Sequence, residues 1–213
     1  MGRPAARSAF ITLEGGEGAG KTTLSGGLAR ALAEAGLPVL RTREPGGAPG
    51  AEVLRALLLQ GSVDWDPVAE AMLMFAARRE HLEKTIRPAL AAGIWVVCDR
   101  FADSTLAYQC HGHGLDLSLY RKLSDVALGD FRPDLTLVLD LPPAEGMRRA
   151  LSRGLPDRFE RLGAPFHARV HAAFRAIATA EPDRCQILDA RQPAEALRRE
   201  AMAVLADRLG APL

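Results

Sequence analysis

The chain has 213 residues, of which 48% are hydrophobic and 25% are charged, and its formal net charge is +1. This composition is that of an ordinary globular protein, and the nearly neutral charge excludes the basic surface by which proteins bind nucleic acid or an anionic membrane. The three cysteines are far apart, which excludes a disulfide framework and fits a reducing, cytoplasmic location. Residues 1–8 lack the apolar segment of a signal peptide, and the longest apolar run, 89–98, is too short to span a bilayer.

A glycine-rich loop follows the first predicted strand. Residues 10–13 form an apolar run that predicts a short buried strand, and residues 23–35 carry leucine or alanine along one face, which predicts an amphipathic helix. Residues 15–22 between them fit the pattern G-x-x-x-x-G-K-[ST]. Glycines let the backbone curl until successive N–H groups point at phosphate oxygens, and the helix presents its positive end to the same anion. This context favours a phosphate-binding loop over an ordinary glycine-rich turn.

The loop predicts the binding of a nucleoside triphosphate together with a metal ion. Lys21 would place a positive charge at the β- and γ-phosphates, and the Thr22 hydroxyl would ligate Mg²⁺. We therefore predict ATP binding by Gly15, Gly16, Glu17, Gly18, Ala19, Gly20, Lys21, Thr22 and Thr23.

Strand and helix signals alternate along the rest of the chain. Asp66 followed by Pro67 predicts the start of a helix that runs towards Pro88, and Pro193 opens a last amphipathic helix. Solidly apolar strands separated by helices predict an α/β structure, a parallel five-stranded sheet flanked by helices on both faces, which is the P-loop NTPase fold. We expect one domain over residues 1–213, flexible at 1–8, with ligands at the carboxyl ends of the strands. The four further strands are predicted at 37–42, 94–98, 135–139 and 186–188.

The third predicted strand ends in a candidate site for a second anion. The chain contains no asparagine, which argues against the Asn-Lys-x-Asp motif of guanine-reading GTPases and leaves a compact kinase. Asp99 at this strand end can hold Mg²⁺, and Arg100 can grip an acceptor phosphate. Asp140, after the fourth strand, is the rival metal ligand. Because residues 141–143 read Leu-Pro-Pro and suit a turn into a helix, we prefer Asp99.

Three segments resemble those of the thymidylate kinases. Residues 97–109, VCDRFADSTLAYQ, resemble the signature of that family, residues 43–47 its REPGG segment, and residues 73–78 its base-binding helix. The resemblance extends from Phe10 to about Arg161. It implies a transferase that phosphorylates dTMP to dTDP with ATP and Mg²⁺ in dTTP biosynthesis, and it implies a homodimer.

The same resemblance implies roles at the acceptor site. Phe75 would stack on thymine and Arg78 would donate to a base carbonyl, with Met74 and Arg79 as substitutes because the spacing varies by one residue. From the helix pattern alone, Phe75 would more often be a core residue. Ala48 stands where the family usually has threonine or serine. The other implied contacts are Thr105 and Gln109 at the base edge, Tyr108 and Glu17 at the sugar, Arg55 and Arg100 at the monophosphate, and Glu44 and Pro45 in the turn near the metal.

An arginine-rich segment predicts a mobile lid over residues 146–162. Gly154 and Pro156 interrupt its helical pattern, and phosphoryl transfer needs positive groups as water is expelled. Some thymidylate kinases carry an extra arginine in the phosphate loop, but this chain has Gly18 there, so the resemblance implies a lid arginine. The alternative is an exposed arginine-rich helix end. With Lys21, the predicted catalytic residues are Arg100, Arg149 and Arg153, and Arg158 is a further candidate.

Two other functions remain open from the sequence. One keeps the fold and takes another nucleoside monophosphate as acceptor. The other is a non-catalytic protein that binds nucleotides, which would leave the arginines of residues 146–162 unexplained.

Overall fold

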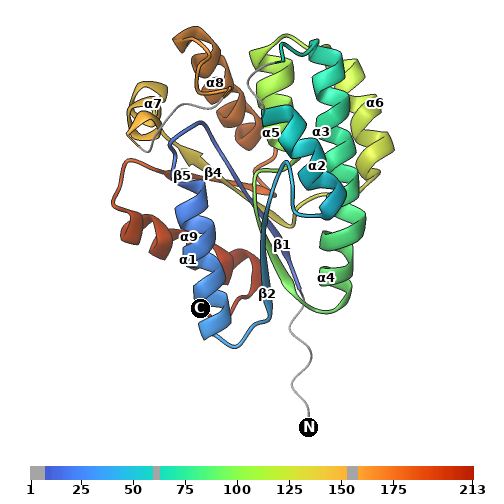
Figure 1. The fold of residues 1–213 in the computed structure, drawn as a ribbon. Coiled ribbons are helices and arrows are strands. Elements are labelled where there is room, and N and C mark those ends of the chain that lie inside the picture. The colour runs from blue at the N-terminus through green and yellow to red at the C-terminus, as the bar shows by residue number, and fades with distance from the viewer. Residues whose placement is uncertain (1–7, 60–62, 153–157) are drawn as a thin grey trace.

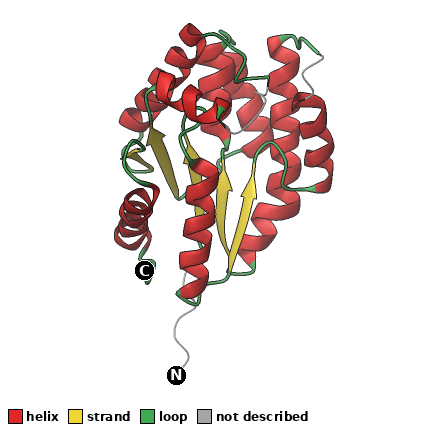
Figure 2. Ribbon diagram, turned by 60° about the vertical axis from the view of Figure 1, so that its left-hand side comes forward, coloured by secondary structure: helices red, strands yellow, loops and turns green. Residues whose placement is uncertain are grey.

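Strands form the centre of the molecule, with helices around them (Figure 2). The sheet has five strands in the order β2-β3-β1-β4-β5. The structure is a computed structural model that describes residues 8–59, 63–152 and 158–213. Every neighbouring pair of strands in the sheet is parallel, as the sequence predicts. The strands are β1 (Phe10–Glu14), β2 (Val39–Arg43), β3 (Trp95–Asp99), β4 (Leu135–Asp140) and β5 (Cys185–Asp189).

Helices cover both faces of this sheet (Figure 1). One face is covered by α1 (Lys21–Glu34) and α9 (Ala194–Leu209), which pack against each other. The helices of the other face and of the sheet edges are α2 (Pro49–Leu59), α3 (Pro67–His81), α4 (Arg87–Ala91), α5 (Ala102–Thr105), α6 (Leu117–Leu128), α7 (Pro143–Leu151) and α8 (Ala164–Ala180), with two π-helical segments, η1 (Leu82–Ile86) and η2 (Leu106–Gly112).

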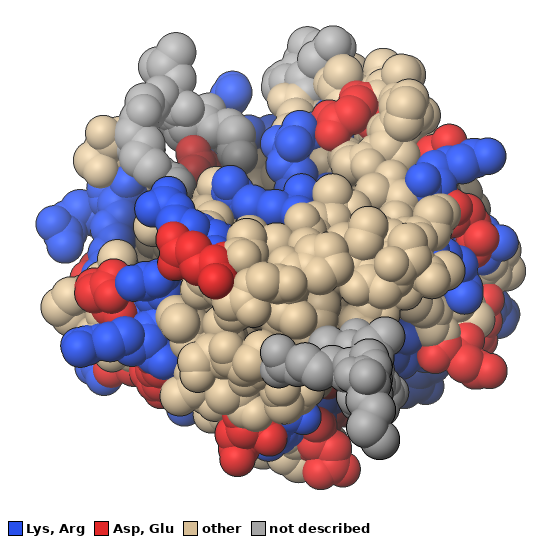
Figure 3. All heavy atoms as spheres, turned by 90° about the horizontal axis from the view of Figure 1, so that it is seen from below, with Lys and Arg blue, Asp and Glu red and all other residues tan. Residues whose placement is uncertain are grey.

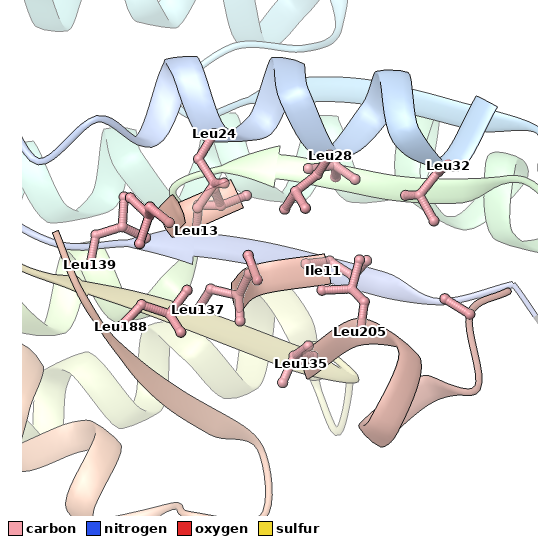
Figure 4. Packing of buried hydrophobic residues seen from close by; sticks show 14 of the residues in the cluster. Ile11, Leu13, Leu24, Leu28, Leu32, Leu135, Leu137, Leu139, Leu188 and Leu205 are labelled. Atoms are coloured by element: carbon pink, nitrogen blue, oxygen red, sulfur yellow. The ribbon is translucent and has the colours of Figure 1, made fainter. Parts of the chain in front are cut away.

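The core under α1 consists mainly of leucine side chains, with alanines and a few other apolar residues between them. Leu24, Leu28 and Leu32 recur every four residues, so that all three point from α1 onto the sheet (Figure 4). Leu205 of α9 and Leu137 of β4 close the same cluster from the other side. This packing fixes the axis of α1 against the sheet, and therefore fixes the position of its N-terminus beside the end of β1.

The helix that begins at Asp66 continues beyond its predicted end. The Asp66 carboxylate accepts hydrogen bonds from the backbone N–H groups of Val68 and Ala69 at 2.9 and 3.0 Å, which is the predicted cap. At the other end the helix does not stop at Pro88, because the π-helical segment η1 precedes the proline and the chain then continues as α4. A wider turn relieves the clash between a proline ring and the preceding turn of helix.

The strand order places a crevice beside β1. The neighbours of β1 are β3 on one side and β4 on the other, so the chain direction across the sheet reverses at β1. In parallel α/β sheets, ligands bind at such a reversal, in the crevice outside the carboxyl ends of the strands. Side chains of both charge signs intermix around uncharged residues on the face drawn in Figure 3, in agreement with the net charge of +1. Within the three described ranges, no helix is both long enough and apolar enough to cross a membrane.

Candidate active site

The glycine loop between β1 and α1 encloses the side chain of Lys21. The Lys21 Nζ donates to the carbonyl oxygens of Gly15 at 3.0 Å and Gly16 at 2.7 Å, and the side chain is almost completely buried. Gly20 caps α1 with a φ of 94°, a left-handed conformation that favours glycine. Burial and the neighbouring charge of Arg100 lower the pKa of Lys21 to about 8. The Lys21 ammonium is therefore already in place in the loop, and the charges around it do not fully offset the cost of its burial. A polyphosphate that enters the loop would add the missing negative charge.

Gly18 lets the loop pack directly against helix α7. A Cβ atom at Gly18 would lie 2.0 Å from the carbonyl oxygen of Gly146, and one at Gly146 would lie 2.3 Å from the carbonyl oxygen of Glu17. The two glycines thus permit a close backbone contact between the loop and α7, which carries Arg149. A side chain at position 18 could fit only if α7 moved. This close contact explains why the loop of this chain has glycine, and not arginine, at position 18.

The predicted metal ligands lie together at the end of β3. The Thr22 Oγ1 donates to the Asp99 Oδ2 at 2.7 Å. No group of three or more His, Cys, Asp and Glu side chains in the described ranges could enclose a metal ion. A cation held by Thr22 and Asp99 would therefore need phosphate and water oxygens for its other ligands, which is the usual coordination of Mg²⁺ in phosphoryl-transfer enzymes. Asp140, the rival candidate, instead bonds to His171 at 2.6 Å and pairs with Arg175, both on α8.

Arg100 has a strained backbone at the centre of the crevice. Its φ of 71° makes it the one positive-φ residue other than glycine in the described ranges, and such conformations cost about 1–3 kcal/mol. Its guanidinium donates to the Gly15 carbonyl oxygen at 3.1 Å, the Glu17 Oε1 at 2.7 Å and the Tyr108 hydroxyl at 3.2 Å. Such strain is typical of functional positions, because the surrounding structure must hold it in place.

The carboxylate of Glu14 holds the turn that follows Arg100. Glu14 closes β1 and is completely buried. Its Oε1 accepts from the backbone N–H groups of Phe101 at 2.7 Å and Ser104 at 3.2 Å, and its Oε2 accepts from the Ser104 hydroxyl at 2.6 Å. Because Arg100 also donates to the Ser104 hydroxyl at 3.2 Å, Glu14 braces the strained residue through its neighbours.

The pH dependence of stability tests these Glu14 contacts. Burial and the nearby charge of Asp103 raise the pKa of Glu14 from 4.5 to about 7. A pKa that is raised on folding contributes stability that is fully present below pH 4.5 and is lost as the pH rises to about 7. In urea titrations, we expect the titration of Glu14 to lower the free energy of unfolding by up to about 3 kcal/mol as the pH rises from 4.5 to about 7. Glu14→Gln cannot titrate, so its unfolding free energy should decline less over the same range. Parallel profiles for the two proteins would contradict the assignment.

Glu17 and Arg100 form an ion pair at the boundary between the loop and the acceptor side. Burial alone would raise the pKa of Glu17, but the charges of Arg100 and Lys21 outweigh burial and lower it to about 2. The same pairing with Glu17 raises the pKa of Arg100 despite the burial of its side chain. Both groups are therefore charged at neutral pH, and Arg100 would exchange part of this pairing for an acceptor phosphate.

A cavity of about 270 Å³ connects this ion pair with helix α3. At one end it reaches the loop through Lys21, and at the other it reaches Arg78. All of the acceptor residues predicted from the sequence line it, with one exception, Phe75. The lining residues among those predictions are Glu17, Glu44, Pro45, Arg55, Arg78, Arg100, Thr105, Tyr108 and Gln109, together with Met74.

The structure corrects the predicted position of Phe75. Phe75 is 3% exposed and packs in the core, with its ring 5.5 Å from that of Tyr120. Met74 lines the cavity in its place, one turn before Arg78 on the same face of α3. Arg79, the other substitute, lies outside the cavity lining and pairs with Glu83 at 3.1 Å. The alternative register, Met74 with Arg78, is thus the one that reaches the cavity.

Arg78, in the wall of the cavity, is held by a buried network. The Arg78 Nε donates to the Glu44 Oε2 at 2.7 Å, and the Arg78 Nη2 donates to the Phe101 carbonyl oxygen at 3.0 Å. The other Glu44 oxygen bonds to the His81 Nδ1 at 3.0 Å. One Glu44 oxygen therefore holds Arg78 and the other holds His81. The predicted place of Glu44 near the metal stays a prediction. The Arg78 Nη1 is buried and has no hydrogen-bond partner in the described ranges, which leaves its donors for a ligand in the cavity.

A second cavity, of about 680 Å³, lies on the other side of the loop, between α1 and α9. Gly18, Gly20 and Thr23 line it, as does Arg149, which donates to the Ala190 carbonyl oxygen at 3.0 Å. Of the other predicted arginines, Arg153 lies outside the described residues, as do Gly154 and Pro156. Arg158 lies outside this cavity lining and forms an ion pair with Glu70. Mobility of residues 146–162 stays a prediction.

Sequence reasoning assigned no role to several buried titratable groups, among them Glu14, Glu70 and His81. Glu14 and Glu70 stand in stretches with many apolar residues, and a charge in such a stretch was the available signal. His81 stands among charged residues, so no such signal marks it in the sequence. The partners of all three, however, lie 37 or more residues away in the chain, so only the folded structure shows what they hold.

Two cavities on opposite sides of a phosphate-binding loop, at the carboxyl edge of a parallel sheet, define the class: an ATP-dependent nucleoside monophosphate kinase with the P-loop NTPase fold. The family model of thymidylate kinase matches residues 13–201. The chain belongs to the thymidylate kinase family.

Relatives of known name agree over nearly the full length. The thymidylate kinase of Caulobacter vibrioides is 51% identical, with 94% of this chain and 97% of the relative covered. That of Pseudomonas fluorescens is 53% identical over 86% of this chain and 88% of the relative. The crystal structure of thymidylate kinase from Ehrlichia chaffeensis matches with a TM-score of 0.75 and 37% identity, over 93% of this chain and 98% of that one.

Proposed function

We propose that this chain transfers the terminal phosphoryl group of ATP to dTMP, giving ADP and dTDP for dTTP biosynthesis. One observation carries the choice of acceptor. The cavity beside the loop is lined by Arg100, which contacts the loop at Gly15, by Arg55 and by Arg78 of α3, whose buried Nη1 has no hydrogen-bond partner in the described ranges. A nucleoside monophosphate with a carbonyl on its base matches both ends.

The donor side uses the loop and its neighbouring helices. Loop N–H groups and Lys21 would hold the β- and γ-phosphates, and the cavity between α1 and α9 would take the rest of ATP, with Arg149 at its wall. Mg²⁺, held by Thr22 and Asp99 directly or through water, would neutralise charge on the phosphates. Arg153 would add positive charge to the migrating group, as the family resemblance implies.

The acceptor side brings the attacking phosphate to the loop. Arg100 and Arg55 would hold the monophosphate, so that its oxygen attacks the terminal phosphorus of ATP in line and without a covalent enzyme intermediate. Glu17 would accept from the sugar 3′-hydroxyl, and Tyr108 would leave no room for a 2′-hydroxyl. Positioning and charge neutralisation then provide the catalysis.

The base side reads a pyrimidine that carries a carbonyl group. Arg78 would donate to that carbonyl through its buried Nη1, and Met74, as the cavity wall one turn earlier, would lie against the face of the ring. Thr105 and Gln109 would meet the hydrogen-bonding edge of the base. A purine is larger and would have to displace these side chains.

A panel of acceptors tests the function. With ATP and Mg²⁺, ADP release should be fastest with dTMP, about tenfold slower in kcat/KM with dUMP, which lacks one methyl group, and at least a hundredfold slower with dCMP, AMP and GMP. Preference for a purine would replace the acceptor assignment with another nucleoside monophosphate. Nucleotide binding without ADP release from any acceptor would instead indicate a non-catalytic binding protein.

We extend the proposal to a homodimer in the cytoplasm. Large apolar side chains are exposed on α3 and on two helices that contact it: Met72 on α3, Val53 on α2 and Val126 on α6. Such a surface supports association with a second copy. The three cysteines are buried and unpaired, which supports a reducing compartment.

A further inference from the structure

Glu70 is a buried acid that the proposed chemistry does not use. It lies in the first turn of α3 and is 1% exposed. A carboxylate enters a protein interior at a large desolvation cost unless hydrogen bonds and charges compensate it. Two side chains provide that compensation, and both come from distant parts of the chain.

The first partner of Glu70 is Gln109 of η2. The Gln109 Nε2 donates to the Glu70 Oε1 at 2.7 Å, and Gln109 is 2% exposed and lines the acceptor cavity. An ionised carboxylate can only accept hydrogen bonds. The amide of Gln109 must therefore turn its NH₂ group towards Glu70 and its carbonyl oxygen the other way, and this orientation follows from the chemistry of the pair.

The second partner of Glu70 is Arg158, whose Nη1 donates to the Glu70 Oε2. The Arg158 guanidinium thereby places a positive charge against the Glu70 carboxylate oxygen that does not bond to Gln109. Arg158 also stacks over Phe159, at 5.4 Å from its ring, and Phe159 lines the same cavity. Glu70 therefore lies between Arg158 and Gln109, with one carboxylate oxygen bonded to each.

The orientation of Gln109 decides which base edge fits. With its NH₂ bonded to Glu70, Gln109 offers a ligand one carbonyl acceptor and its second N–H donor. The N3–H group of thymine or uracil needs an acceptor, and an adjacent carbonyl of the same base needs a donor. Cytosine has an acceptor at N3, which would face the carbonyl oxygen of Gln109 without a hydrogen.

We propose that Glu70 is a positioning residue that fixes the amide of Gln109 in the orientation that accepts from N3–H of the base, and so selects thymine over cytosine. The inference rests on the proposed function, since it concerns the same acceptor site. Glu70 itself touches no substrate.

Glu70→Gln tests the proposal, because its side chain has the same shape but can donate as well as accept. In steady-state assays we expect the KM for dTMP to rise about tenfold, with kcat within threefold of wild type. The ratio of kcat/KM for dTMP to that for dCMP should fall about tenfold, since Gln109 can now turn over. Glu83→Gln is the matched control: it removes a carboxylate from ion pairs with Arg79 and Arg87 outside the cavity and should leave both values unchanged.

A double-mutant cycle separates positioning from a merely structural role. If Glu70 acts through Gln109, the effect of Glu70→Gln on the KM for dTMP should largely disappear in a Gln109→Ala background. An equal effect in both backgrounds, or an unchanged dTMP to dCMP ratio in Glu70→Gln, would overturn the proposal.

If Glu70→Gln does not fold, Glu70→Asp, which keeps the charge for Arg158 but withdraws the carboxylate from Gln109, should raise the KM in the same way. A wild-type preference for another acceptor would refute the proposed function itself, whereas a wild-type preference for dTMP with unaltered variants would refute this inference alone.

Discussion

Lys21→Ala should lower kcat by about a thousandfold or more while the protein still folds. The Lys21 ammonium is held inside the loop by the carbonyl oxygens of Gly15 and Gly16 and is the one lysine among the residues that line the two cavities. Its charge would be used mainly as negative charge develops on the transferred phosphoryl group, so its loss should appear in kcat. ADP release measured at saturating ATP and dTMP reports this value.

Stability should change little in this variant. Burial and the charge of Arg100 lower the pKa of Lys21 from 10.5 to about 8, so the folded protein holds the charged ammonium less favourably than water does. Removing it therefore relieves a cost of about 3 kcal/mol, which offsets the loss of its two hydrogen bonds. Lys84→Ala, at an exposed position in η1, is the matched control and should retain wild-type turnover. Near-normal turnover by Lys21→Ala would refute the role of Lys21.

Arg100→Ala should lower kcat/KM for dTMP by a hundredfold to a thousandfold and affect the affinity for ATP much less. The Arg100 guanidinium is half of the ion pair with Glu17 at the point where the acceptor phosphate would enter. Without it, Glu17 would stand in that place as an uncompensated negative charge and repel the phosphate. Kinetics with dTMP as the varied substrate, together with calorimetric ATP binding, measure the two effects separately.

Arg100→Gly separates the guanidinium from the strained backbone. The φ of 71° at this position is easy for glycine and unfavourable for alanine, so Arg100→Gly should be more stable than Arg100→Ala by about 1 kcal/mol, while both lose activity alike. Arg132→Ala removes an exposed arginine elsewhere and serves as the control. Unchanged KM and kcat for dTMP in Arg100→Ala would show that another cation holds the acceptor.

The acceptor site shows where sequence reasoning stops. The spacing of the helix places Met74, Phe75 and Arg78 relative to one another, but it cannot say which of them faces the crevice. That choice is made by the packing of α3, which buries Phe75 against Tyr120 and turns Met74 towards the cavity. Likewise, Glu44 belongs to a recognisable segment, yet its bonds to Arg78 and His81 join positions that are 34 and 37 residues apart.

The sequence by itself determined the parallel sheet, the phosphate-binding loop and the family, because each depends on local order along the chain. Apolar runs determine the strands, and glycines followed by a lysine determine a loop whose geometry is set within eight residues. The tertiary structure alone decided which side chain of α3 lines the cavity, why Gly18 must lie against Gly146, and what Glu14 and Glu70 hold. These are contacts between segments distant in the chain, and their geometry is set by how the helices pack on the sheet, which residue order does not specify.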